Sequence, residues 1–328
     1  MLHLNQDRYD YLGHCLADST FNTYASAFNS YHSFCSMSSL PLFPLDENVV
    51  ELYVCFLARR LAYQSIKVYL SALQFYSITN GYTAGIGDMS HLYYVMRGIR
   101  IVLGSSRSRP RRLPITTAQM IALFRHIRKH YASSDAKMLC AAVSMAFFGL
   151  LRSSEYTSPT LTRCPNPTLT TKDIRIVNNI LVIHIRKSKT DPFQSGTFIR
   201  IGPNHSEICP VNAFLEYASM IPQVSGPALV FADGSFLTRN CLSAILSSCF
   251  PSVSLNTHSF RIGGASTAAS IGIPDSAIQI LGRWSSNAYK RYLHFSDDTI
   301  VDISERMASS RSSNRIWDSA WLISKATK

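Results

Sequence analysis

Residues 256–267 read NTHSFRIGGAST, and this stretch places His258 and Arg261 three positions apart. Residues at that spacing share one face of a helix, so the imidazole and the guanidinium would point the same way. Two donor groups aimed together favour an anion as their common partner. The remainder of the chain has to indicate whether that anion is a structural carboxylate or a substrate phosphate.

The charge of the chain is high and unevenly distributed. The 328 residues include 32 lysines and arginines against 20 acidic residues, a formal net charge of +12. Residues 1–96 hold four basic and seven acidic residues, a net charge of −3, so residues 97–328 carry +15. No acidic residue stands between Met89 and Ser134, where nine lysines and arginines fall. The excess predicts a polyanionic partner, nucleic acid first of all, with a solvated basic linker as the alternative.

The composition indicates a globular chain that buries real cores, with 46% hydrophobic and 11% aromatic residues. Its eight cysteines stand singly with no CxxC pair, which favours a reducing compartment and gives no support to a zinc site. The longest apolar stretch, residues 138–151, is too short to span a bilayer and is predicted to form a buried helix. We therefore expect an intracellular protein, nuclear in a eukaryotic host, with no membrane partner.

The first hundred residues show the periodicity of helices. Apolar residues recur every three or four positions over 21–31, 49–57 and 66–76, and a fourth helix is expected at about 90–103. Phe21 belongs to the apolar face of the first of these, and Asp46 is a candidate cap for the second. The pattern predicts a small all-helical domain over residues 1–104.

A polar, basic stretch with two prolines, GSSRSRPRRLP, follows at residues 104–114 and predicts a linker over 105–114. After two more helical patterns, residues 171–202 change to short β-branched runs separated by Asn178-Asn179, which predicts a three-stranded meander. Helical patterns then return and continue to about residue 307. The expected fold class is mostly α with a small β-meander, an all-helical domain followed by an α+β domain over 115–308.

Five separated motifs of the second domain resemble, in their order, those of the tyrosine recombinase superfamily, the phage-integrase-like enzymes. They are GLLRSSE (149–155), SKT (188–190), HSFR (258–261), LGRW (281–284) and RYLHF (291–295). The N-terminal helices resemble that family's core-binding, SAM-like DNA-binding domain. The forms RKSKTDP and LGRWSSNAYKRYL are most similar to the Crypton and DIRS-like recombinases of eukaryotic transposons.

The resemblance implies that Arg152 and Arg261 grip the phosphate that is cleaved. A guanidinium is always protonated, and its planar fork of donors matches two phosphate oxygens on which negative charge develops. The alternative for Arg152 is a helix-end arginine that pairs with Glu155. His258 would donate to the same phosphate or carry the proton of the nucleophile.

A lysine at the end of the second strand would protonate the 5′ oxygen that leaves, as the resemblance implies. Lys189 is favoured for this role over Lys187, two residues away. The lysine that is not used would belong to a solvated basic hairpin.

The nucleophile implied by the resemblance is Tyr292, with Tyr289 as its rival three residues earlier. Attack by the phenol would leave a covalent 3′-phosphotyrosine and a free 5′ hydroxyl. Because the energy of the phosphodiester bond is kept, religation would need no ATP, no metal and no other cofactor.

The sixth catalytic position is open between Arg283 and Trp284. Trp284 is favoured, as an indole N–H donor that also supports the tyrosine segment, and an ordinary core tryptophan is the alternative. Gly263 and Gly264 would permit close approach of DNA or of another helix.

The implied activity is that of a site-specific recombinase or integrase from a mobile element, which cleaves and rejoins double-stranded DNA during integration or transposition. No small-molecule substrate is expected, and the working form would be a homo-oligomer on DNA, from dimer to tetramer. The alternatives are a type IB topoisomerase-like nicking-closing enzyme and a domesticated, inactive DNA-binding protein. We expect DNA contacts from the arginines in and before the linker: Arg97, Arg100, Arg107, Arg109, Arg111 and Arg112.

The chain ends in a polar joint and an apolar segment, IWDSAWLI at residues 316–323. Large apolar side chains left in water cost about 1.5–3 kcal/mol each, so this tail within 309–328 is expected to dock. It would do so either in cis, as a closing helix, or in trans on a neighbouring catalytic domain.

Overall fold

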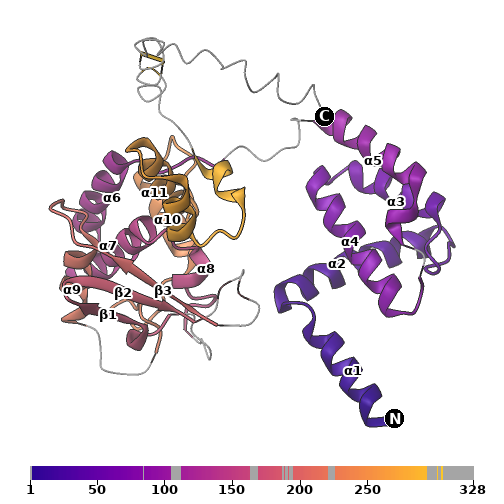
Figure 1. The fold of residues 1–328 in the computed structure, drawn as a ribbon, viewed down its shortest axis with the longest axis horizontal. Coiled ribbons are helices and arrows are strands. Elements are labelled where there is room, and N and C mark those ends of the chain that lie inside the picture. Colours follow the sequence, from indigo (N-terminus) through magenta and orange to yellow (C-terminus); the bar gives the residue numbers. More distant parts are fainter. Residues whose placement is uncertain are drawn as a thin grey trace, which may run out of the picture. The chain divides into compact units, whose positions relative to one another are not determined.

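The computed structural model describes residues 2–83, 85–104, 112–162, 169–186, 188, 191, 195–220, 226–293, 301 and 304–305. The chain divides into two compact units, Met1–Pro110 and Arg111–Lys328 (Figure 1). It is mostly helical with one small antiparallel sheet, which confirms the fold class expected from the sequence. No helix among the described residues is long and apolar enough to cross a membrane.

The regular secondary structure described in the first unit is all helical. Its elements are α1 (Leu2–His14), α2 (Asp18–Met37), α3 (Glu47–Ala58), α4 (Tyr63–Thr79), the short 3-10 helix η1 (Ile86–Asp88) and α5 (Ser90–Leu103). The last four α-helices coincide with the predicted ones, whereas α1 was not predicted. Every side chain described in α1 is exposed, so it has no apolar face that a periodicity could reveal.

The core of the first unit forms where α2, α3 and α4 meet. Tyr31 and Tyr53 are fully buried there, with their ring centroids 5.0 Å apart. Asp46 accepts a hydrogen bond from the backbone N–H of Val49 at 3.1 Å, which confirms the predicted cap of α3. The inward position expected for Phe21 is wrong, because this side chain is 50% exposed. The ring contacts between α2 and α4 begin one turn later, at Tyr24.

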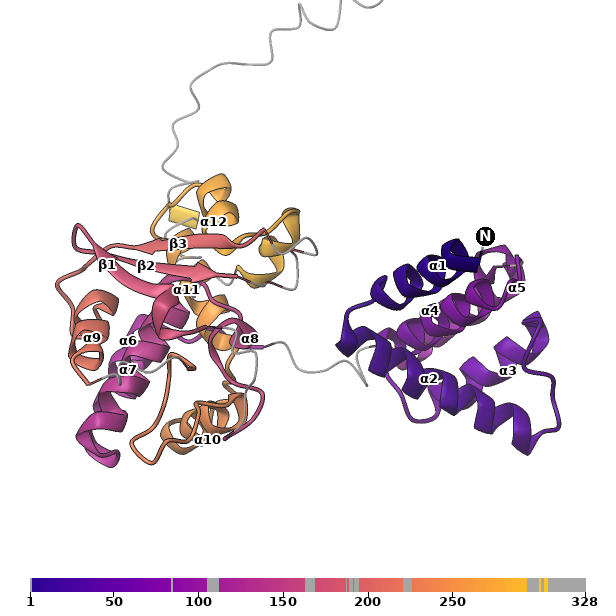
Figure 2. The same ribbon diagram turned by 90° about the horizontal axis from the view of Figure 1, so that it is seen from below.

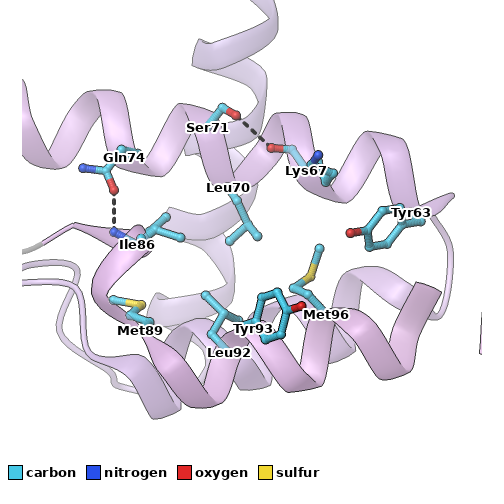
Figure 3. Close-up of a pocket in the computed structure, with 11 residues that line it drawn as sticks. Tyr63, Lys67, Leu70, Ser71, Gln74, Ile86, Met89, Leu92, Tyr93 and Met96 are labelled. Carbon is cyan, nitrogen blue, oxygen red and sulfur yellow. Dashed lines mark hydrogen bonds between the residues drawn. The ribbon is translucent and has the colours of Figure 1, made fainter. Parts of the chain in front are cut away.

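A groove of about 460 Å³ lies between α4 and α5, as Figure 3 shows. Leu70 and Met96 form part of its floor, and both are buried. Gln74 of α4 accepts a hydrogen bond from the backbone N–H of Ile86 and so holds η1 at one end of the groove. The groove is predominantly apolar.

The second unit packs its helices around α7. Its helices are α6 (Thr117–His130), α7 (Ser133–Phe148), α8 (Ser153–Tyr156), η2 (Thr171–Asp173), α9 (Pro210–Ala218), α10 (Arg239–Cys249), α11 (Ser259–Ser270), α12 (Asp275–Gly282) and η3 (Asn287–Tyr292). Eleven residues of α7 are buried, and α6, α9 and α11 all contact it. The apolar stretch at 138–151 is therefore a buried helix up to Phe148, as predicted.

The sheet is an antiparallel meander of β1 (Ile174–Val177), β2 (Ile180–Ile185) and β3 (Thr197–Ile201), in that order. Figure 2 shows the three strands side by side in the second unit. Asn178 and Asn179 have φ angles of 50° and 61°, the left-handed conformations that a two-residue hairpin of this kind requires. Ile183 pairs with Ile174 on one side and Ile199 on the other, which confirms the predicted meander.

Two glycines set the depth of α11 in the second unit. A Cβ atom at Gly263 would collide with the carbonyl of Ile115, and one at Gly264 would collide with the carbonyl of Phe147. Of the two uses expected for these glycines, the structure shows the close approach to protein backbone. The approach brings the start of α11, with His258 and Arg261, to the end of α7.

Candidate active site

The turn after α7 gathers two arginines on one carbonyl oxygen. Leu150 has a φ of 47°, a left-handed conformation that reverses the chain directly after the helix. Its carbonyl accepts hydrogen bonds from Nη1 of Arg261 and, at 3.2 Å, from Nη2 of Arg283. The GLLRSSE, HSFR and LGRW motifs, which are far apart in the sequence, thus meet at this turn.

Glu155 is the buried carboxylate of the site, and its side chain is 1% exposed. Its Oε1 accepts from Nη1 of Arg152, and its Oε2 accepts from both the backbone N–H of Arg152 and Nη2 of Arg283, all at 2.8 Å. Burial alone would raise the pKa of Glu155, but the charges and hydrogen bonds of Arg283 and Arg152 outweigh it and lower this pKa. Glu155 is therefore an anion that fixes two cations.

Arg152 stands at the cap position of α8, and its side chain is 17% exposed. The pairing with Glu155 that the sequence offered as the alternative for Arg152 is present. Arg152 also donates to the hydroxyl of Ser188 at 2.9 Å, and that hydroxyl lies 3.2 Å from Oε1 of Glu155. Ser188 directly precedes Lys189, so it ties the end of the strand hairpin to Arg152. No sequence pattern predicted this contact.

Arg261 is the most deeply buried arginine of the described chain, with 1% exposure. Its two terminal nitrogens donate to the carbonyls of Leu150 and Gly282. The ring of Trp284 lies over its guanidinium, 4.3 Å from Cζ to the ring centroid. Glycine is required at 282, since a Cβ there would enter the indole ring. The described structure thus holds this arginine from two sides by protein groups.

His258 lies half-buried at the cap position of α11, in a strongly positive environment. Burial and, after it, the charges of four arginines together lower its pKa from 6.5 to about 4, the arginines acting in the order Arg112, Arg261, Arg239 and Arg152. The imidazole is therefore neutral at pH 7 and has one nitrogen that can accept a proton. From the sequence we expected Arg112 only as a DNA contact, and no sequence pattern indicated a role for Arg239.

Arg283 and Trp284, the rivals for the sixth position, have different surroundings. Arg283 adopts a left-handed backbone conformation, with a φ of 55°, and is ion-paired to Glu155. Trp284 packs on Arg261 and, with ring centroids 6.1 Å apart, on Tyr289. The indole thus packs against the segment that leads to Tyr292, whereas the side chain of Arg283 is bound to the carboxylate of Glu155.

The two tyrosines proposed for attack also differ. Tyr289 is 2% exposed, packs with Leu150, Ala265 and Ile278, and donates its hydroxyl to Asp275 at 2.8 Å. This hydrogen bond raises the pKa of Tyr289. Tyr292 closes η3 at its C-terminal end, and its side chain lies outside the described residues.

Several predicted contact residues lie elsewhere. Arg97 and Arg100 are exposed on α5, with the Arg100 guanidinium 6.0 Å from the ring centroid of Tyr63. The positions that fall outside the described residues are Arg107, Arg109, Arg111, Lys187, Lys189 and the tail at 316–323.

Two other arginines of the acid-free stretch are already neutralised. Arg125 pairs with Glu207 at 2.6 Å and Arg128 with Glu216 at 3.6 Å. Both acids follow the sheet in the sequence. The folded chain therefore places carboxylates next to a stretch of sequence that contains none. Within the described part of the chain, no three His, Cys, Asp or Glu residues are grouped so that they could hold a metal ion.

Comparison with known proteins gives similarity in structure only. No protein-family model and no curated protein sequence matches the chain. The Tn1549 transposon integrase in complex with transposon right end DNA superposes with a TM-score of 0.60 at 15% identity, covering 94% of this chain and 98% of that one.

Two further solved structures are similar over most of the chain. The XerH site-specific recombinase bound to palindromic difH substrate gives a TM-score of 0.60 at 17% identity, with 88% of this chain and 79% of that one covered. A lambda integrase dimer bound to a COC′ core site gives 0.54 at 16% identity, with 89% and 77% covered. The chain therefore has the fold of integrases and site-specific recombinases.

Proposed function

We propose that the chain is a site-specific DNA recombinase or integrase that cleaves and rejoins strands through Tyr292. The observation that carries the proposal is the convergence of Arg152, Arg261 and Arg283 on Glu155 and the carbonyl of Leu150, one helical turn from the neutral imidazole of His258. Several cationic groups close to one neutral proton acceptor suit a phosphodiester, whose negative charge increases as a nucleophile adds. The shared fold with DNA-bound integrases and the five ordered motifs support the same activity.

The proposed reaction exchanges one phosphodiester bond for another. The Oη atom of Tyr292 attacks the phosphorus and gives its proton to the neutral His258. The bond from phosphorus to the 5′ oxygen breaks, and this oxygen takes a proton from Lys189. A 3′-phosphotyrosine and a 5′ hydroxyl result, and attack by a 5′ hydroxyl reverses the step. Since one bond forms as one breaks, religation consumes no external energy source.

In this proposal Arg152 and Arg261 bind the phosphate in different ways. Arg152 reaches it from the partly exposed side of the site while Glu155 holds its other edge. Arg261 donates to the carbonyls of Leu150 and Gly282 through its two terminal nitrogens. A guanidinium has five N–H donors, so these carbonyls can hold Arg261 in place while it donates to a phosphate oxygen, and the hydrogen bond to the anionic oxygen is the stronger one.

The proposal extends to assembly and origin. The chain would act as a homo-oligomer on double-stranded DNA, with the tail at 316–323 docked on a neighbouring catalytic domain. The motif forms RKSKTDP and LGRWSSNAYKRYL favour a eukaryotic mobile element of the Crypton or DIRS-like kind, and hence action in a nucleus.

The test is covalent capture of DNA. The full chain is incubated with a pool of nicked duplexes of random sequence, labelled at either the 5′ or the 3′ end of the nicked strand, and run on a denaturing gel. A 3′-phosphotyrosine retains the fragment with the 5′ label, so this label alone should migrate with the protein. DNA binding with no adduct would favour the inactive DNA-binding protein, and an adduct carrying the 3′ label would contradict the chemistry.

Sequencing of the captured DNA separates the remaining alternatives. A recombinase should enrich one site from the random pool. A topoisomerase-like enzyme should capture DNA with little sequence preference and relax supercoiled plasmid at protein concentrations too low for assembly.

A further inference from the structure

A second cavity, of about 390 Å³, lies beside the candidate active site between the starts of α8 and α10. One wall comes from Ser153, Ser154 and Ser158 and the other from Thr238, Arg239 and Asn240. The two walls are joined by a hydrogen bond of 2.8 Å from the backbone N–H of Ser158 to the carbonyl of Leu237. The described residues that line the cavity carry hydroxyls, one amide, one guanidinium and the ring of Pro159, and none of them carries a carboxylate.

Part of this lining is already occupied by local hydrogen bonds. The hydroxyl of Thr157 donates to the carbonyl of Ser153 at 2.7 Å, and that of Thr238 accepts from the backbone N–H of Cys241 at 3.2 Å. These contacts cap α10 and fix α8. The groups that remain to meet a ligand are the Arg239 guanidinium, the Asn240 amide and the hydroxyls of Ser153 and Ser154.

Arg239 differs in its surroundings from five other arginines of this unit. Arg125, Arg128, Arg152, Arg186 and Arg283 each lie within ion-pair distance of a carboxylate. No such pair joins Arg239 to an acid in the described ranges. An exposed guanidinium above a wall of hydroxyls matches an anion with several oxygens.

The cavity lies close to the site already described. Ser153 follows Arg152 directly in the chain, and Arg239 is one of the charges that lower the pKa of His258. An anion bound by Arg239 would therefore lie next to the phosphate assigned to Arg152 and His258. DNA supplies phosphates at regular intervals along one strand, with most protein contacts directed to them.

We propose that this cavity binds a second DNA phosphate, one that flanks the phosphate being cleaved, through Arg239 and the serine hydroxyls of α8. This inference rests on the proposed function, because it takes the cleaved strand as the source of the phosphate. The second contact fixes the direction of the strand across His258 and so holds the phosphorus in line with Tyr292.

The test measures how DNA affinity depends on salt. The full chain and its variants are titrated with two labelled duplexes, one rich in G·C and one rich in A·T, by fluorescence anisotropy at several KCl concentrations. Arg239→Gln should reduce the slope of log K against log salt by about one, with an equal loss of affinity for both duplexes. Arg239→Lys should keep the slope. Ser154→Asp, which adds a negative charge at an exposed lining position, should weaken binding to both duplexes.

The matched control is Arg128→Gln, another arginine of the same unit, which is paired with Glu216. It should leave the slope unchanged. An unchanged slope for Arg239→Gln would overturn the second phosphate site, and a loss confined to the G·C-rich duplex would replace it by base reading at guanine. If the unaltered protein binds neither duplex, the proposed function itself fails, so the two failures are distinguishable.

Discussion

The guanidinium of Arg261 lies over the indole ring of Trp284, 4.3 Å from Cζ to the ring centroid. The same guanidinium donates to the carbonyl of Gly282, two residues before the indole. The HSFR and LGRW motifs are thus one structural unit, in which the second motif both anchors and covers the arginine of the first. Trp284 then acts by positioning Arg261 as well as by packing on Tyr289.

Substitution of Trp284 should separate these effects. A cation–π contact out of water contributes up to about 2 kcal/mol, so Trp284→Ala should lower the rate of covalent DNA attachment about 30-fold. Trp284→Phe keeps a ring over Arg261 and should retain most of that rate. The measurement is single-turnover adduct formation at saturating DNA, with thermal unfolding to confirm that both variants are folded. Equal rates for the Ala and Phe variants would show that the ring does not position Arg261.

Glu155 should be the most costly polar residue of the site to replace. Removal of one partner from a buried ion pair costs about 3–5 kcal/mol, and Glu155 is a partner to two arginines. Glu155→Gln should therefore lower the free energy of unfolding by about 3 kcal/mol in urea titrations. Glu216→Gln, which removes an exposed pair with Arg128, should change it by less than about 1 kcal/mol. Similar losses in both variants would contradict the role of burial.

The protonation of His258 predicts a dependence of stability on pH. Its pKa is about 4 in the folded chain against 6.5 for the free side chain, so the unfolded chain takes up the proton first. Stability from this group is full above pH 6.5 and is lost as the pH falls from 6.5 towards 4. The drop in Tm between pH 7.5 and pH 5 should be smaller in His258→Asn than in the unaltered protein. His205→Asn, at an exposed position of the same unit, should leave the drop unchanged.

Sequence patterns predicted the elements well where one face of an element is buried. The helices α2 to α5, the cap at Asp46 and the meander with its Asn178-Asn179 turn follow from local periodicity and turn chemistry. Helix α1 could not be predicted in this way, because its described side chains are all exposed and no apolar spacing marks it.

The site was predictable as a set of motifs but not as a network. Spacing in the sequence cannot show that Glu155 joins Arg152 to Arg283, because Arg283 lies far along the chain from both. It cannot show either that Ser188 contacts both Arg152 and Glu155, since dozens of residues separate Ser188 from them. The importance of Arg239 was missed for the same reason. Its neighbours in the sequence are unremarkable, and only the folded chain brings it towards His258.

Ser188 should position Arg152 for its phosphate. Its hydroxyl accepts from Arg152 at 2.9 Å, and a hydrogen bond to a charged group contributes about 1.5–3 kcal/mol. Ser188→Ala should lower the rate of adduct formation about tenfold while DNA affinity stays the same. Ser188→Thr keeps the hydroxyl and should restore the rate, which a purely structural role of the loop would not require. An unchanged rate in the Ala variant would remove Ser188 from the account.

The assignment of the nucleophile is the central claim, and the two tyrosines of the last described segment test it. Tyr289→Phe removes a hydrogen bond to Asp275, so it should lower Tm yet still form the covalent DNA adduct. Tyr292→Phe should bind DNA with unaltered affinity and form no adduct, because only the attacking oxygen is lost. Both variants and the unaltered protein are incubated with the 5′-labelled nicked duplex, and the adduct peptide is identified by mass spectrometry. The account predicts a DNA-linked peptide containing modified Tyr292; an adduct formed by Tyr292→Phe and absent from Tyr289→Phe would contradict it.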